Sequence, residues 1–144
     1  MSRAGIRDGL VAVLRATSGF TAGDGGTALA NDHRALNAGV DRAAIVLNDR
    51  FEQRPLTIGG GNQVDWRFSV EVYIRHNNDI PQARADSDIY VQNIVDKVNG
   101  DRTLGGAAFD ALVEAGVVAD ENFVIGGKPF LLEALTVRCT ENLV

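Results

Sequence analysis

A run of thirteen residues with regular alternation constrains the fold of this chain more than any other feature. Between residues 64 and 76 the polar positions, together with Tyr73, alternate with six apolar ones, which are Val64, Trp66, Phe68, Val70, Val72 and Ile74. A period of two predicts a β-strand with one buried face and one face in water. Thirteen extended residues would span about 43 Å at roughly 3.3 Å each, well beyond a typical strand. We therefore expect a strand that projects as a hairpin arm around residues 50–66, with Trp66 and Phe68 in the core.

Two amphipathic helices are predicted to pack against this strand. Residues 3–17 repeat apolar side chains at helical spacing after Ser2, a typical N-cap residue. Residues 80–99 follow Asp79 and Pro81 and stop at Gly100. Ile89 lies opposite the apolar stripe of this second helix, so we interpret it as a candidate contact residue.

The remaining periodic segments predict an α+β fold with a mostly antiparallel four-stranded sheet. Residues 43–49 read as a buried strand, 54–58 as an edge or bulged segment, and 122–126 with 130–139 as a second hairpin. Residues 107–115 read as a short third helix. The two main helices would pack on one face of the sheet, and the length of 144 residues favours a single domain over residues 1–144.

Residues 18–42 form a long polar stretch rich in Gly, Ala, Asp and Asn. A loop of this length is uncommon inside a compact domain and is usually functional or disordered. We expect it to become ordered against a neighbouring chain. Phe20, Asp24 and Arg34 are therefore interface candidates.

The charge balance argues against a protein whose task is to bind nucleic acid. The formal net charge is −5, and residues 101–144 alone carry −4. An acidic chain gains nothing from neutralising phosphates. The single cysteine, Cys139, excludes an internal disulfide, and its alternation with apolar neighbours predicts burial.

The chain carries no targeting or membrane segment that we can identify. Arg3 and Arg7 precede an apolar stretch, but Asp8 interrupts it, which is not typical of a signal peptide. The apolar runs are too short to cross a membrane. We expect a protein made and kept in the cytoplasm, or assembled from there.

No motif points to catalysis, a cofactor or a metal. The glycine-rich segments 19–26 and 59–61 lack the lysine of a phosphate-binding loop. His33 and His76 have no partner at a zinc-ligand spacing. We therefore expect no enzyme activity, no cofactor and no metal. Arg67 and Arg75, with Glu71 between them, are candidates for ion pairs between subunits, or are ordinary surface charges.

The order of these elements resembles the tail terminator proteins of long-tailed bacteriophages, the group that includes the lambda tail terminator. The resemblance covers most of the chain. It comprises the N-terminal helix, AAIVLND at 43–49, VDWRFSVEVYIRH at 64–76, PQARADSDIYVQNIVDKVNG at 81–100 and the TLGG turn at 103–106. The TLGG turn is the most specific local match, and the stretch 18–42 departs from the family pattern.

The resemblance implies a structural virion protein that is assembled in the host cytoplasm as a ring, typically a hexamer. Such a ring caps the head-proximal end of the tail tube, stops its polymerisation and provides the docking surface for the head connector. The glycine turn, Gly59, Gly60, Gly61 and Asn62, would then contact the tube protein, the connector or neighbouring subunits. Six copies would carry a formal charge of −30, since each carries −5, so DNA would pass the channel without specific binding.

Two alternatives stay open. One is another neck component, such as a head-completion or stopper protein. The other is a small ligand-binding α+β domain, which would need a concave pocket with converging polar groups.

Overall fold

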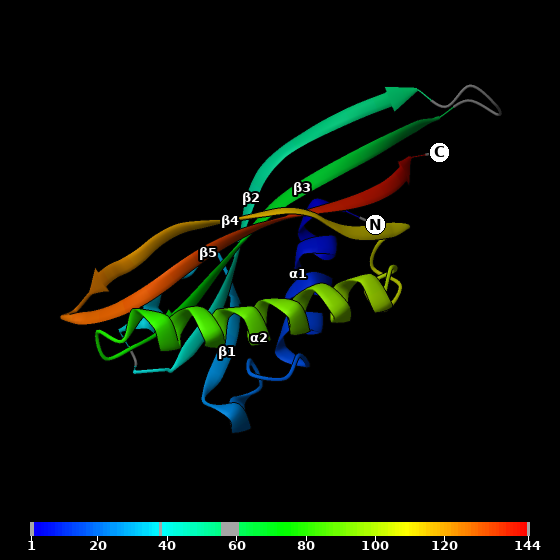
Figure 1. Cartoon of the computed structure of the whole chain (residues 1–144). Helices are drawn as coiled ribbons and strands as arrows, with labels where there is room; N and C mark the ends of the chain where they lie inside the picture. Colours follow the sequence, from blue (N-terminus) through cyan, green and yellow to red (C-terminus); the bar gives the residue numbers. More distant parts are fainter. Residues whose placement is uncertain (1, 38, 56–60, 144) are drawn as a thin grey trace.

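The computed structural model of the chain describes residues 2–37, 39–55 and 61–143, and it is an α+β domain with one mixed sheet. Figure 1 shows two helices, α1 (Arg3–Arg15) and α2 (Ile80–Gly100), against one face of this sheet. The strands are β1 (Gly26–Ala30), β2 (Arg42–Pro55), β3 (Asn62–Arg75), β4 (Asp110–Ile125) and β5 (Lys128–Leu143). Two short 3₁₀ helices, η1 (Ala22–Asp24) and η2 (Arg34–Leu36), precede and follow β1 in the sequence.

The strand order is β1-β2-β3-β5-β4, which places β3 at the centre of the sheet. β1 runs parallel to β2, and every other neighbouring pair is antiparallel. The apolar positions of β3 all point to the helix face, where Phe68, Val70 and Val72 are fully buried. The alternation predicted for residues 64–76 therefore specifies the central strand of the fold.

Both predicted helix starts are confirmed. The Ser2 hydroxyl accepts a hydrogen bond from the Gly5 amide at 3.0 Å, and the Asp79 carboxylate accepts one from the Gln82 amide at 3.1 Å. These side chains satisfy amide groups that have no partner inside the first helical turn. The buried face of α1 includes Ile6, Leu10 and Leu14, as its spacing predicts.

The predicted four-stranded antiparallel sheet with a third helix is wrong. The sheet has five strands and is mixed, because β1 lies inside the stretch 18–42 and pairs in parallel with β2. This stretch also supplies core: Phe20, Ala28 and Leu36 are fully buried in their own chain. Its elements are only three to five residues long, so no periodicity reveals them in the sequence.

The predicted helix over residues 107–115 is also wrong. Residues 102–107 form turns, and β4 begins at Asp110 and pairs with β5. In this register Ala111 lies opposite Cys139 and Val113 opposite Val137. The apolar positions of this stretch suit a short helix and a strand equally well, so the unpaired edge of β5 decides the outcome.

The predicted arm is built from three strands. β2 pairs with β3 as far as Pro55 and Asn62, and β5 accompanies β3 to the same level through Asn62 and Leu143. Figure 1 shows this end of the sheet extending well beyond β1, whereas the β4–β5 turn projects at the opposite end. Residues 56–58 of the expected edge segment lie outside the described residues.

Candidate assembly surface

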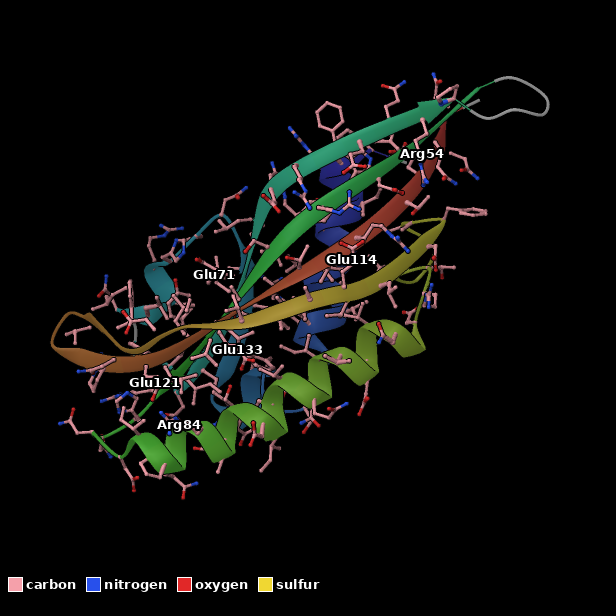
Figure 2. The ribbon with its side chains drawn as sticks, turned by 45° about the horizontal axis from the view of Figure 1, so that its top comes forward. Arg54, Glu71, Arg84, Glu114, Glu121 and Glu133 are labelled. Carbon is pink, nitrogen blue, oxygen red and sulfur yellow. The ribbon has the colours of Figure 1, made fainter. Side chains whose placement is uncertain are left out.

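The sheet face that points away from the helices, called the outer face below, carries most of the charged side chains of the arm. The register puts Asp65, Arg67 and Glu71 of β3 on this face, next to side chains from β2, β4 and β5. Figure 2 shows Arg54, Glu71 and Glu114 spread over three different strands. Over the arm, none of the described helices covers this polar face, so it is available for contact with other molecules.

Arg67 is the centre of an ionic network on this face. Its side chain is only 11% exposed, and its Nε donates to Glu114 Oε2 of β4 at 3.0 Å. Its NH1 lies 3.2 Å from Glu52 of β2, and Glu114 also lies 3.5 Å from Arg138 of β5. The hydrogen bond to Glu114 raises the pKa of Arg67 above its usual range. The network therefore fixes charges from four strands in one arrangement.

A second polar group braces the arm. The Asp65 carboxylate is buried, although the alternation predicts a side chain in water. It accepts hydrogen bonds from Thr140 Oγ1 of β5 and from Arg54 NH2 of β2, both at 2.9 Å. A buried carboxylate satisfied from both neighbouring strands holds the three-stranded arm together.

The opposite face of the arm carries the single tryptophan. Trp66 is half-buried against the core, and its indole Nε1 donates to Glu141 at 2.8 Å. The Phe51 ring lies 5.1 Å from the indole, and the Arg3 guanidinium lies 5.5 Å from it. The predicted core position of Trp66 therefore holds in part, because the indole lies where the core meets the arm.

At the other end of the outer face, η2 covers the sheet. Tyr73, which the alternation places in water, is only 2% exposed and packs with Leu36 and Phe130. Its hydroxyl donates to Glu71 at 3.1 Å, and His33 lies 2.8 Å from the same carboxylate. Burial and the Glu71 charge raise the pKa of Tyr73.

Two of the four predicted interface residues of the glycine turn, Gly61 and Asn62, are among the described residues. Gly59 and Gly60 lie outside the described residues. Gly61 is exposed with a φ of 83°, and Asn62 opens β3 opposite Pro55.

The predicted interface residues of the stretch 18–42 have local roles. Phe20 is fully buried and packs edge-on against Tyr90, with ring centroids 6.2 Å apart. Asp24 accepts hydrogen bonds from Thr21 and the Gly19 amide, which lower its pKa. Arg34 is exposed and pairs with Asp32 at 2.8 Å.

The other four candidates are spread over the molecule. Arg67 and Glu71 share the outer face, but their ion partners come from their own chain. Arg75 is half-buried at the end of β3. Ile89 is 57% exposed on the outward side of α2, as predicted. The structure therefore brings Arg67 and Glu71 together on one face and leaves Ile89 on the other.

The sequence interpretation found only the end of the outermost strand, at residues 122–126, and missed residues 110–121 of β4. Val117, Val118 and Val124 of β4 are each more than half exposed. β4 is an edge strand, since it pairs with β5 on one side only in the described part of the chain. The run Gly116–Ala119 signals a strand by its β-branched valines, but it has no alternation to show which side is buried.

The described surface has depressions of similar volume whose walls differ in composition. A depression of about 400 Å³ is lined by Asp41, Arg42, Ile74, Arg75, His76, Asn77 and Asp86. This lining is mostly polar, whereas a depression of about 390 Å³ lined by Arg84, Ser87, Asp88, Val118, Glu121, Leu131 and Glu133 has mixed walls. Within residues 2–37, 39–55 and 61–143, no three His, Cys, Asp or Glu side chains gather closely enough to hold a metal ion.

Cys139 lies in the core, as its alternation predicts. It is fully buried, and burial raises the pKa of its thiol to about 12. The nucleophilic form of cysteine is the thiolate, so this residue is inert in the folded chain.

Comparison with known proteins gives no family. Neither the scan against protein-family models nor the search of curated proteins finds a match to this chain. Neither helix in the described ranges is long and apolar enough to span a membrane.

Proposed function

We propose that this chain is a structural subunit of a phage neck, a ring-forming tail terminator that caps the head-proximal end of the tail tube. In this role it stops tube polymerisation and offers the surface on which the head connector docks. The work is binding between proteins, with no covalent step. The site of action is the virion, after assembly in the host cytoplasm.

The observation that carries the proposal is the three-stranded arm formed by β2, β3 and β5. It extends beyond β1, and its outer face has charges fixed by Arg67 and Asp65. Figure 2 labels one ion partner of each, Glu114 and Arg54. An isolated domain gains little stability from such an extension, because the β2 side chains in the arm are exposed to water. A subunit that must reach a neighbouring subunit or a tube end gains contact area from it.

The charge of the chain supports the same role. Each copy carries −5, so a closed ring is strongly acidic and repels the phosphates of passing DNA. Repulsion of this kind suits a channel that DNA crosses without stopping.

The alternative functions differ in what they bind. A stopper protein would share the small acidic subunit but would bind the connector rather than tube ends. A ligand-binding domain would need a pocket with mostly apolar walls; the depression beside His76 is mostly polar, and the one beside Val118 and Leu131 combines apolar walls with charged groups.

The decisive experiment combines native mass spectrometry with negative-stain imaging. The purified chain is measured alone and then mixed with tail tubes assembled from the tube protein encoded in the same phage genome. Closed rings that sit on tube ends and limit tube length support the proposal. A chain that leaves the ends and the length distribution of the tubes unchanged overturns it, and binding to the connector alone identifies a stopper.

A further inference from the structure

The two long open edges of the sheet differ in how they are protected. β1 covers β2 only from Arg42 to Val46, so residues 47–55 of β2 have a strand, β3, on one side only in the described chain. That edge holds Asp49, Arg50, Glu52 and Arg54, a register shift between Asn48 and Arg50, and Pro55. Charges and proline on an edge prevent indiscriminate pairing, so this edge favours a partner strand of complementary charge over a second copy of itself.

The edge of β4 lacks these charges. Residues 115–119 read Ala-Gly-Val-Val-Ala, and all five are exposed. Val117 is 62% exposed and Val118 is 51% exposed. Their register with β5 is regular from Ala115 to Val118, with shifts only on either side. An exposed apolar edge of this kind is a template for a further strand.

Strand direction selects an occupant for this edge. β2, β3, β5 and β4 alternate in direction, because each neighbouring pair is antiparallel. A second copy in the same orientation would therefore present its β2 antiparallel to β4, and the sheet would continue without a change of pattern. Contact between two different surfaces is also what a closed ring needs.

The side chains fit in one register. Arg50 and Asp120 both face the outer side, have opposite charges, and form no ion pair within the described residues. At the next paired position, Phe51 lies opposite Val118. Both side chains face the helix side of the sheet, and each is about half exposed. The pairing of β4 shifts by one residue between Val118 and Asp120. Side chains that face the same side of the sheet therefore stay opposite one another, and the next pair is Glu52 with Val117.

We infer that β4 of one copy pairs antiparallel with the arm of β2 in the next copy, with Arg50 opposite Asp120 and Phe51 opposite Val118. This contact rests on the proposed ring and specifies how its subunits join. Within one chain, Val117 of β4 and Ile45 of β2 lie in the same row across the sheet, because Val117 pairs with Ala134, Ala134 with Glu71, and Glu71 with Ile45. Pairing Val117 with Glu52 instead shifts the neighbour by six paired positions, about 20 Å at roughly 3.3 Å each. A constant shift of this kind is how a sheet of tilted strands closes on itself.

Disulfide trapping tests the register directly. Phe51→Cys and Val118→Cys are made separately, and the two proteins are mixed under mild oxidation. The native Cys139 is fully buried and does not compete. We expect a covalent dimer in the mixture at least tenfold more abundant than in either protein alone. A Val118→Cys protein that links to itself instead shows β4–β4 pairing and overturns the inference, as does a mixture that yields no dimer.

An edge substitution tests the same contact without a cross-link. Val117→Lys places a charge on the edge, and Phe109→Lys is the matched control, since Phe109 is 56% exposed and lies outside β4. We expect Val117→Lys to raise the concentration needed for assembly at least tenfold and Phe109→Lys to leave it unchanged. Both should keep the wild-type melting temperature at dilutions where the chain is monomeric. Assembly of Val117→Lys at the wild-type concentration overturns the contact.

Tube binding separates this inference from the proposed function. If the mixed disulfide dimer forms but the rings do not bind tube ends, the strand contact is supported and the tail terminator role is refuted. If the rings cap tubes but the mixed dimer does not form, the role is supported and the contact is refuted. A wild-type chain that stays monomeric at every concentration refutes the contact, and its effect on tube length then decides the function.

Discussion

Phe20 offers the sharpest test of whether the stretch 18–42 belongs to the folded core. Its ring is fully buried, stacks edge-on with Tyr90, and lies under Gly26, where an added Cβ would come within 2.7 Å of the Phe20 Cα. Replacing a buried Phe by Ala costs about 3–5 kcal/mol, and backbone packed this closely leaves little room for collapse. We expect Phe20→Ala to lower the free energy of unfolding by about 4 kcal/mol. With a urea m-value of about 1–3 kcal/mol/M, the midpoint should fall by about 1.3–4 M.

The control for this variant is the same change at an exposed site. Phe109 is 56% exposed, so Phe109→Ala should change the free energy of unfolding by less than about 1 kcal/mol. Both variants are unfolded in urea at one protein concentration and followed by the fluorescence of Trp66. Equal and small effects of the two substitutions would show that residues 18–42 lie outside the core and would refute our account of β1 and its surroundings.

Three further predictions follow from the ionic groups and the thiol. Arg67→Ala should destabilise the fold by about 1–3 kcal/mol in urea unfolding, because it leaves the partly buried Glu114 with only the longer, 3.5 Å contact to Arg138. The hydrogen bond from Arg102 lowers the pKa of Asp110 below 3.8, so this pair stabilises the fold above that pH and loses its effect as the pH falls through the lower value. Asp110→Asn should therefore flatten the acid side of a stability profile below about pH 4, and an unchanged slope would contradict this. Cys139 should react with a thiol reagent at pH 8 only after unfolding, since its pKa is raised to about 12.

The sequence predicts the elements that have a clear period and fails where a segment is short or fits two periods. Helices that begin at Ser2 and Asp79 and the strand around Phe68 follow from capping and spacing, which are local signals. β1 has only five residues, Gly26–Ala30, too few to show a period. Residues 107–115 fit two periods, and only the free edge of β5, which lies far along the chain, selects the strand.

Some residues of the candidate surface could likewise be predicted from the sequence, and others could not. Arg67 and Glu71 could be found from the sequence, because they share one face of a strand with a clear period. Their partners could not: Glu114 and His33 come from elements distant in the sequence, and only the register brings them close. The exposure of Val117 was also hidden, because it depends on β4 being the last strand of the sheet.

The central position of β3 has a consequence for how the chain folds while the ribosome is still synthesising it. Its partner β5 ends at Leu143, 68 residues after β3 ends at Arg75. At about 5–20 residues per second, the ribosome needs roughly 3–14 seconds to supply the missing strand. During that interval one edge of β3 has no partner, and α2 is the only later element available to shield its apolar face. Under the proposed function many copies of the chain are made at once, and this interval would then expose neighbouring nascent chains to mispairing. The charges of Asp65, Arg67 and Glu71 on β3 then protect the half-made sheet well before they take part in any finished contact.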